Sequence, residues 1–307
     1  MCPVRKTPND VVIVSFSRTA LCKATRGSFR NTATETMLAT VLKSVVEQSK
    51  IDPKLIEDIC VGSCLQPGAG ATTSRMGQFL AGIPETTSLM AINRQCSSGL
   101  QALMTIANSI RGGQIDIGIG AGVESMSLYD FSKAFDPPIL SKLVDENKQA
   151  KSCKLPMGLT SENVASRYGI TREMQDRFAA ESQRKAAKAM EEGLLNQEVT
   201  PMDTIILDKE GKEIKVTADK DEGVRKESTF ESLSKLKPVF KKDGSTTAGN
   251  ASQLTDGAAA VLLARRSVAE QLGLPIRGRI LTYSAVGVDP EIMGIGPAVA
   301  IPKALEK

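Results

Sequence analysis

Short runs of β-branched residues alternate with amphipathic helical patterns in the N-terminal part of the chain, and this alternation strongly constrains the fold. Within 10–16, the run Val-Val-Ile-Val is typical of a strand that is covered on both faces. Residues 34–48 place apolar side chains at the spacing of one helical face. The same criteria predict further strands and helices at 56–64, 74–81, 88–93, 99–110 and 116–122. Such alternation predicts an α/β fold with a mainly parallel sheet.

The composition changes between residues 126 and 244, where charged residues are frequent and a helical pattern covers 172–192. The apolar strand pattern returns at 256–264. The intervening stretch is therefore predicted to be an insertion into the sheet domain. Beyond it, the sequence predicts the start of a strand at 280–288 and of a helix at 297–307.

Bulk composition excludes several functional classes. The net charge of +4 is too small to predict nucleic acid as a partner. No apolar stretch approaches the roughly 20 residues of a membrane span, and residues 1–13 lack the apolar core of a signal peptide. In a chain of this size, scattered cysteines predict free thiols in a reducing compartment, here Cys2, Cys22, Cys60, Cys64, Cys96 and Cys153. A soluble intracellular protein is expected.

The chain contains no histidine. Histidine is the usual general base near neutral pH and a common metal ligand. A cysteine-histidine dyad or a histidine-ligated metal within this chain is therefore excluded. Cys60 and Cys64 resemble half of a zinc site, but no second pair follows at a suitable spacing, so no metal site is predicted.

The sharpest local feature is the string Asn-Arg-Gln-Cys-Ser-Ser-Gly at 93–99, between a predicted strand and a predicted helix. Cys96 is expected where the strand becomes the helix. Free backbone amides and the helix dipole favour negative charge there, so they stabilise a thiolate and can bind an oxyanion. The small residues after Cys96 leave room for a substrate carbonyl. The alternative is a buried structural cysteine.

The string at 93–102 resembles the acyl-accepting motif of 3-ketoacyl-CoA thiolases, especially the peroxisomal type. Further thiolase-like motifs follow in family order at 118–126, 157–165, 241–260 and 286–302. The resemblance implies an α/β chain with the layered α-β-α fold of thiolases. It also implies cleavage of 3-ketoacyl-CoA to acetyl-CoA and a shortened acyl-CoA, as in fatty acid β-oxidation.

By this resemblance, Cys96 is the nucleophile that carries the acyl group as a thioester. Coenzyme A (CoA) is the implied co-substrate, and no permanently bound cofactor is implied. Ala248, Gly249 and Ser252 resemble the small residues along which the family lays the pantetheine arm. A bulky side chain there would block the arm.

Three other positions are similar to family residues that line the CoA site. Arg225 matches an arginine near the adenine, where its planar group can stack, and the alternative is a solvated loop charge. Met157 and Met293 resemble apolar positions beside the pantetheine and the acyl group, and the alternative for both is core packing.

The resemblance also implies a domain division. Residues 1–125 and 245–272 match the N-terminal thiolase domain, 126–244 match its inserted loop domain, and 273–307 match the start of a C-terminal domain that is truncated. Three family strings of the second half, Asn-Glu-Ala-Phe, Gly-His-Pro and Cys-x-Gly, have no match here. The chain is therefore expected to be a fragment of an acyltransferase and catalytically deficient by itself. The complete protein is expected to be a homodimer or homotetramer.

Two alternatives stay open at this point. One is a naturally short, non-catalytic thiolase-like protein that binds acyl-CoA or docks on another subunit. The other is a condensing enzyme related to ketoacyl synthases, although the strings at 93–96 and 247–252 match thiolases better. The resemblance points to the peroxisome, with mitochondrion and cytoplasm as alternatives, and it does not separate degradative from biosynthetic use or give a chain-length preference.

Overall fold

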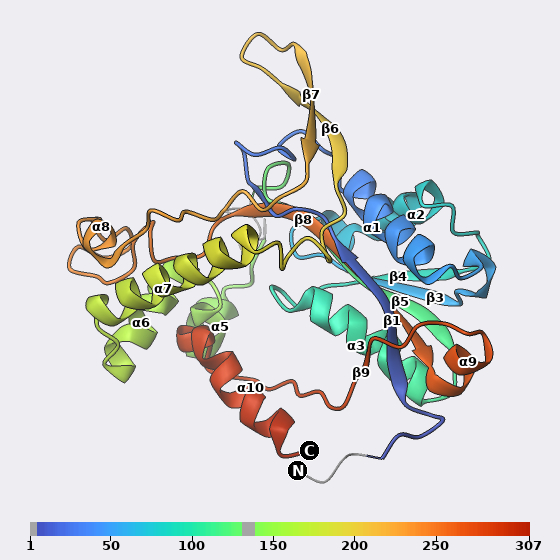
Figure 1. The fold of residues 1–307 in the computed structure, drawn as a ribbon. Coiled ribbons are helices and arrows are strands. Elements are labelled where there is room, and N and C mark those ends of the chain that lie inside the picture. The colour runs from blue at the N-terminus through green and yellow to red at the C-terminus, as the bar shows by residue number, and fades with distance from the viewer. Residues whose placement is uncertain (1–4, 131–138) are drawn as a thin grey trace. The chain divides into compact units, whose positions relative to one another are not determined.

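The computed structural model describes residues 5–130 and 139–307, and its chain divides into two units (Figure 1). The first unit contains Met1–Phe131, Leu195–Gly223 and Leu254–Leu281, and the second contains Ser132–Leu194, Val224–Gln253 and Thr282–Lys307. The domain limits implied by the family resemblance stay a prediction, because units defined by contacts need not share the boundaries of family domains. Cys2 lies outside the described residues.

A mixed sheet forms the centre of the first unit, with strand order β4-β3-β5-β8-β1-β9 and with β2 paired to β8. The strands are β1 (Val11–Arg18), β2 (Cys22–Lys23), β3 (Asp58–Gly62), β4 (Ser88–Ile92), β5 (Ile117–Ser125), β8 (Thr255–Arg265) and β9 (Gly278–Arg279). The helices are α1 (Thr34–Ser49), α2 (Ala71–Leu80), α3 (Ser98–Arg111) and α9 (Arg266–Gln271), with short 3₁₀ helices η1 (Pro53–Leu55) and η2 (Pro67–Gly70). The structure thus confirms the α/β class and the strands and helices predicted for this unit up to residue 264.

The prediction of a mainly parallel sheet is wrong. β3 runs parallel to β4 and β5, but β8 runs antiparallel to both β5 and β1. The reason lies in where the chain re-enters the sheet: Ser125, at the end of β5, pairs with Asp256, at the start of β8. The long stretch between these two residues leaves the sheet and returns to it at the same end of the strands, so β8 must run in the direction opposite to β5.

Helices cover both faces of this sheet, α1 on one side and α3 on the other (Figure 1). Alternate residues of β5 show the difference between the faces. Ile117 and Ile119 belong to the buried cluster that includes Leu38 and Leu42 of α1. Gly120 faces α3, and a Cβ added there would lie only 2.4 Å from the Cα of Leu103. The glycines of β5 therefore allow α3 to lie directly against the strand backbone.

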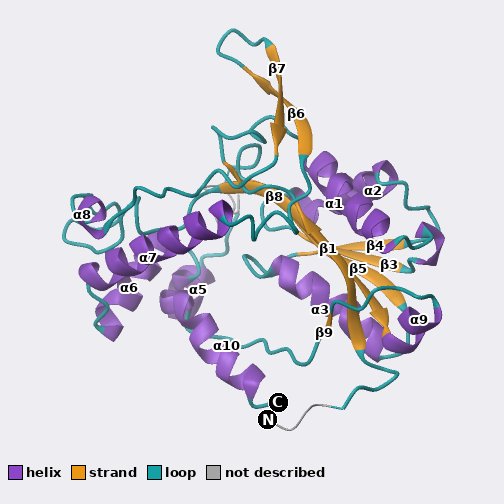
Figure 2. Cartoon of the chain, viewed as in Figure 1, coloured by secondary structure: helices purple, strands orange, loops and turns teal. Residues whose placement is uncertain are grey.

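The first unit also contains a two-stranded antiparallel hairpin of β6 (Met202–Leu207) and β7 (Glu213–Ala218), drawn in orange in Figure 2. Its turn is held by Asp208, whose side chain accepts hydrogen bonds from the amides of Glu210 and Lys212. Sequence analysis did not predict this hairpin.

The second unit is helical in its regular structure. Its elements are α4 (Leu143–Glu146), α5 (Lys148–Ser152), α6 (Met157–Tyr168), α7 (Arg172–Glu191), α8 (Phe230–Leu233), the 3₁₀ helix η4 (Pro290–Ile295) and α10 (Gly296–Leu305). The predicted helices at 172–192 and 297–307 are confirmed as α7 and α10. Thr171 caps α7 by accepting a hydrogen bond from the Met174 amide at 3.2 Å.

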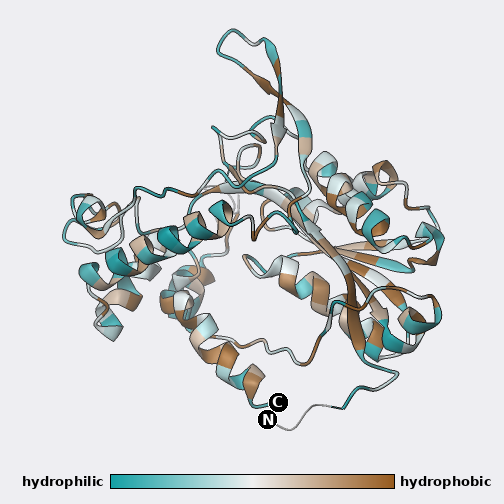
Figure 3. Ribbon diagram, viewed as in Figure 1, coloured by the Kyte–Doolittle hydropathy of each residue, from teal (hydrophilic) through white to brown (hydrophobic). Residues whose placement is uncertain are grey.

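α7 is mainly hydrophilic (Figure 3), and Asp176 is its buried residue. The predicted strand at 280–288 is wrong, because regular pairing ends with the two residues of β9. β9 runs antiparallel to β1 and pairs with Val12 and Ile13. Because β1 begins at Val11, residues after Arg279 have almost no strand left to pair with. Within 5–130 and 139–307, no helix is both long and apolar enough to cross a membrane.

Candidate active site

Cys96 lies in the turn between β4 and α3, two residues before the helix begins, and its side chain is exposed. This is the predicted strand-to-helix position. The first N–H groups of a helix lack acceptors within it, so they carry the positive end of the helix dipole. At this turn the Ser97 and Ser98 amides donate to the carbonyls of Arg94 and Gln95 at 3.1 and 3.0 Å, so these two are not free to bind an oxyanion as the sequence predicted. The exposed thiol at the positive end of α3 is the part of the arrangement expected of a nucleophile that attacks a carbonyl.

The turn before Cys96 is tightly constrained. Gln95 has φ of +50°, a left-handed conformation that residues with a Cβ seldom adopt. Ser98 holds the turn from the helix side, because its hydroxyl accepts a hydrogen bond from the Arg94 amide at 2.9 Å and donates one to the Gln95 carbonyl. The Gln95 amide donates to Asn93 Oδ1 at 2.8 Å. These contacts fix the direction in which Cys96 points.

A cavity of about 410 Å³ opens beside Cys96 within the first unit. Its walls include Cys64, Glu124 and Met126, and glycines line the side next to the helix start. This volume is at the small end of ligand pockets, which span about 300–1,000 Å³. It is large enough for an acyl group beside the thiol.

Close packing fixes the helix start against the sheet. A Cβ added to Gly62 of β3 would lie 2.3 Å from the Ser98 carbonyl carbon and 2.6 Å from the Gly99 nitrogen. A Cβ added to Gly122 of β5 would lie 3.3 Å from the Cα of Gly99, which is a looser but still tight contact. Backbone therefore meets backbone at the place where Cys96 is presented.

Two residues that the sequence analysis did not select lie in the cavity wall, Cys64 and Glu124. The Glu124 carboxylate accepts hydrogen bonds from the Cys64 amide at 2.7 Å and from the Ser63 hydroxyl at 3.2 Å. Burial raises the pKa of Glu124 above its ordinary value, although these donors oppose the rise. A signal was present, since an acidic residue follows the glycine-rich strand pattern inside the 118–126 motif.

The thiols differ sharply in their surroundings. Burial and the nearby Glu124 charge raise the pKa of Cys64 to about 11. Burial and Asp58 raise the pKa of Cys60 to about 11, and burial raises that of Cys22 to about 12. These three thiols are protonated near neutral pH and are poor nucleophiles.

We expect alkylation to separate Cys96 from the cysteines of β3 and its following turn. Trypsin places Cys96 in the peptide 95–111 and both Cys60 and Cys64 in the peptide 55–75. At about pH 8, iodoacetamide should modify 95–111 at least about tenfold faster, because a pKa near 11 leaves few thiolates. Mass spectrometry of timed samples measures both rates. In urea the rates should converge, and equal rates in the native protein would contradict the assigned burial.

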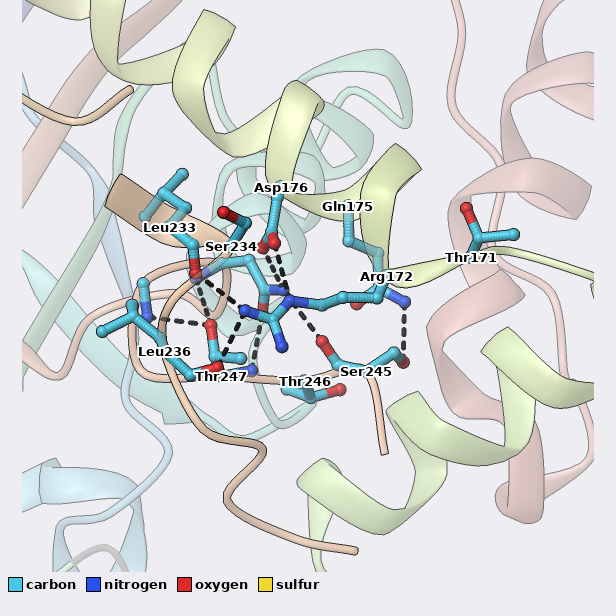
Figure 4. A network of polar contacts seen from close by, with 12 residues as sticks. Thr171, Arg172, Gln175, Asp176, Leu233, Ser234, Leu236, Ser245, Thr246 and Thr247 are labelled. Carbon is cyan, nitrogen blue, oxygen red and sulfur yellow. Dashed lines mark hydrogen bonds and ion pairs between the residues drawn. The ribbon is translucent and has the colours of Figure 1, made fainter. Parts of the chain in front are cut away.

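In the second unit, a buried polar network holds the segment 245–250 (Figure 4). The buried carboxylate of Asp176 accepts hydrogen bonds from Arg172 Nε at 2.6 Å and from Asn250 Nδ2 at 2.9 Å. Asn250 Oδ1 accepts a hydrogen bond from the Thr247 amide at 2.7 Å. Arg172 also donates to the carbonyls of Leu233 and Leu236. α7 thereby fixes the backbone of this segment.

Glu162 of α6 binds the start of the same segment. Its carboxylate accepts hydrogen bonds from the Ser245 amide at 2.9 and 3.0 Å and from the Thr246 amide at 2.8 Å. Burial by itself would raise the pKa of Glu162, but these amide hydrogen bonds outweigh it and lower the pKa.

We expect the stability of the second unit to depend on pH through Glu162. Its folded pKa lies below the ordinary 4.5, so its contribution is present above about pH 4.5 and is lost as the pH falls through the folded pKa. Glu162→Gln should lower the free energy of unfolding at neutral pH and flatten its decline in acid. Urea unfolding at several pH values measures this. Glu227→Gln, at an exposed position of the same unit, is the control and should leave the pH profile unchanged.

The structure places the predicted CoA contacts in the second unit. Ala248 and Ser252 are exposed on the segment that follows Thr247, and Gly249 lies between them. A Cβ added to Gly249 would meet Leu236 Cδ1 at 2.4 Å and Leu233 Cδ2 at 2.6 Å, so a larger residue there would displace the segment.

The other three predicted contacts are also on the second unit. Arg225 has an exposed side chain, and its amide donates a hydrogen bond to Gln183 of α7 at 2.8 Å. Met157 begins α6 and is half-buried. Met293 lies in η4, which packs against α6, and is 40% exposed, so core packing does not account for it. The roles of these residues stay predictions.

The chain is similar to known proteins over nearly its whole length. The family model described as "Thiolase, N-terminal domain" matches residues 11–267. The human peroxisomal 3-ketoacyl-CoA thiolase is 54% identical over 298 residues, which cover 97% of this chain and 70% of that protein. The peroxisomal 3-ketoacyl-CoA thiolase of Yarrowia lipolytica is 52% identical over 301 residues, 98% of this chain and 72% of the other.

Solved structures agree with the sequence relatives. The dimeric peroxisomal thiolase of Saccharomyces cerevisiae superposes with a TM-score of 0.89 at 48% identity, covering 98% of this chain and 76% of that one. The acetyl-CoA acetyltransferase of Bacillus anthracis superposes with a TM-score of 0.84 at 35% identity, covering 97% and 76%. The predicted thiolase-like layered fold is confirmed, and the chain belongs to the thiolase family.

Proposed function

We propose that Cys96 accepts an acyl group from a 3-ketoacyl-CoA and passes it to CoA, the reaction of a 3-ketoacyl-CoA thiolase. The observation that carries this proposal is the exposed Cys96 thiol at the start of α3, beside a cavity large enough for an acyl group. The printed names of the human and Yarrowia relatives, which are 54% and 52% identical, support the substrate class.

The reaction divides into two halves. In the first, the Cys96 thiolate attacks the 3-keto carbonyl, the bond between carbons 2 and 3 breaks, and acetyl-CoA leaves after carbon 2 takes up a proton. In the second, the CoA thiol attacks the Cys96 thioester, releasing the shortened acyl-CoA and restoring the thiol. Both halves require proton transfer. Since the chain contains no histidine, we expect it to carry the acyl group but to turn over slowly by itself.

The segment 247–252 is assigned to the pantetheine arm, with Ser252 as a direct contact. Ala248 and Ser252 are exposed and Gly249 between them is partly exposed, and the Asp176 network keeps the backbone of the segment in one conformation. Arg225 is exposed, and its planar guanidinium is assigned to stacking on the adenine of CoA. Met157 and Met293 are assigned to the apolar wall beside the pantetheine and the acyl chain. No permanently bound cofactor is part of the proposal.

The names of the relatives also support a peroxisomal location and a homodimeric assembly. The relatives from human and Yarrowia are named peroxisomal, and the yeast structure is described as dimeric. Fluorescence microscopy of the tagged protein tests the location, and light scattering of the purified chain tests the assembly.

A second function follows from the absence of histidine: binding of acyl-CoA without transfer. One experiment separates the two. The purified chain is incubated with acetoacetyl-CoA or acetyl-CoA and digested with trypsin, and the mass of peptide 95–111 is then measured. A thioester on Cys96 supports acyl transfer. Protection against thermal unfolding by CoA without any thioester supports binding alone. If neither a thioester nor protection is observed, both functions are overturned.

A further inference from the structure

The left-handed conformation of Gln95 requires an explanation, because it directly precedes the proposed nucleophile. Such a conformation costs on the order of 1–3 kcal/mol and persists only where the surroundings impose it. Gln95 is not a glycine, and its φ is +50°. The contacts that impose this conformation also determine where Cys96 points.

Cys64 is at the centre of those contacts. Its carbonyl accepts a hydrogen bond from Asn93 Nδ2 at 3.0 Å, and its thiol donates to Gln95 Oε1 at 3.3 Å. Asn93 in turn accepts from the Gln95 amide at 2.8 Å. The raised pKa of Cys64 keeps the thiol protonated, so it stays a donor near neutral pH.

Glu124 determines the position of Cys64. Besides the Cys64 amide at 2.7 Å and the Ser63 hydroxyl, its carboxylate accepts a hydrogen bond from the Leu65 amide at 3.3 Å. Hydrogen bonds thus connect Glu124 to Cys64 and Cys64 to the 93–95 turn, and the chain continues directly from Gln95 to Cys96. All of these residues belong to the first unit, and Glu124, Cys64 and Cys96 line one cavity.

We propose that Glu124 is a positioning residue for acyl transfer, which fixes Cys64 and, through Cys64, the strained turn that presents the Cys96 thiol. The proposal rests on the proposed function of Cys96 as the acyl acceptor. It adds a residue that acts through others rather than on the substrate. Small errors in the position of a reacting group are costly, and a displacement of about 1 Å can reduce a rate about 100-fold.

The chain offers a matched control in Glu222. Its carboxylate also accepts from two amides and one hydroxyl, those of Lys23 and Ser28, at 2.6–2.9 Å. Glu222 belongs to the same unit but does not line the cavity that contains Cys96. If only the loss of an acceptor for three donors mattered, substitution of either glutamate should therefore affect the protein alike.

The experiment compares Glu124→Gln and Glu124→Ala with Glu222→Gln in the full chain. In Glu124→Gln the new amide nitrogen faces N–H donors and cannot accept from them. We expect the rate of acetyl transfer from acetyl-CoA to Cys96, measured on the tryptic peptide 95–111, to fall at least about tenfold in both Glu124 variants. Glu222→Gln should stay within about twofold of the parent chain. Thermal unfolding of each variant reports whether the loss merely follows stability.

A double-mutant cycle completes the test. If Glu124 acts through the turn, Asn93→Ala and Glu124→Gln should each slow acetyl transfer, and their combination should be little worse than either single variant. Unchanged transfer in Glu124→Gln, additive losses in the cycle, or an equal loss in Glu222→Gln each overturns the positioning role. If the parent chain accepts no acyl group, the proposed function of Cys96 fails first and the positioning role fails with it.

Discussion

Replacing Cys96 with alanine should abolish acyl transfer by this chain. Among the described residues that line the cavity, the other thiol is that of Cys64, which is protonated and bonded to Gln95 and is therefore a poorer acceptor. Removing a nucleophile costs enzymes several orders of magnitude, so the thioester yield on peptide 95–111 should fall at least about 1000-fold. Mass spectrometry after incubation with acetyl-CoA measures the yield.

Because the Cys96 side chain is exposed, its replacement should change the free energy of unfolding by less than about 0.5 kcal/mol. Cys153→Ala is the matched control, since Cys153 is also an exposed free thiol and lies in the other unit. It should retain acyl transfer in full. A thioester that persists in Cys96→Ala, on Cys64 or elsewhere, would show that the assigned nucleophile is wrong.

Gly62→Ala should have the largest effect on stability among the single substitutions considered. The added Cβ would lie 2.3–2.6 Å from three backbone atoms of Ser98 and Gly99, so α3 must move away from β3. Overpacking of a buried site typically costs about 1–3 kcal/mol, and contact with backbone places this change at about 3 kcal/mol or more. Differential scanning calorimetry should show a clear fall in Tm.

The same displacement moves the helix start that follows Cys96, so Gly62→Ala should also lower acyl transfer per folded molecule. Gly99→Ala is the control for stability, because a Cβ there would meet nothing within 4 Å. It should keep its Tm within a few degrees of the parent chain. If Gly62→Ala unfolds at the same temperature as Gly99→Ala, β3 and α3 do not pack as closely as described.

The sequence was sufficient to predict those elements whose side chains have one strong periodic pattern. The β-branched run of β1 and the apolar face of α1 are examples, since each must be buried and each repeats at the period of its own structure. The motif around Cys96 also indicated the family to which the chain belongs.

Sequence patterns were insufficient where the structure depends on contacts between distant segments. The residue pattern of a strand does not indicate whether it runs parallel or antiparallel to its neighbours, so the antiparallel direction of β8 was not predicted. Apolar residues at 280–288 resemble a strand, but a strand also needs a partner of sufficient length, and β1 begins too late in the chain to supply one. Glu124 was missed because its significance depends on the backbone of Cys64, 60 residues earlier.

The pairing of Ser125 with Asp256, two residues 131 positions apart, also bears on how such a protein can change during evolution. Part of the chain between them, Leu195–Gly223, belongs to the first unit and places Met202 and Ala218 in its buried cluster. Insertions or exchanges that leave the register of β5 and β8 intact are therefore expected in the parts that belong to the second unit. The intervening chain includes Arg225 and the 247–252 segment, which we assign to CoA. Substrate preference can therefore diversify in these second-unit segments while the strands that support the Cys96 turn stay the same.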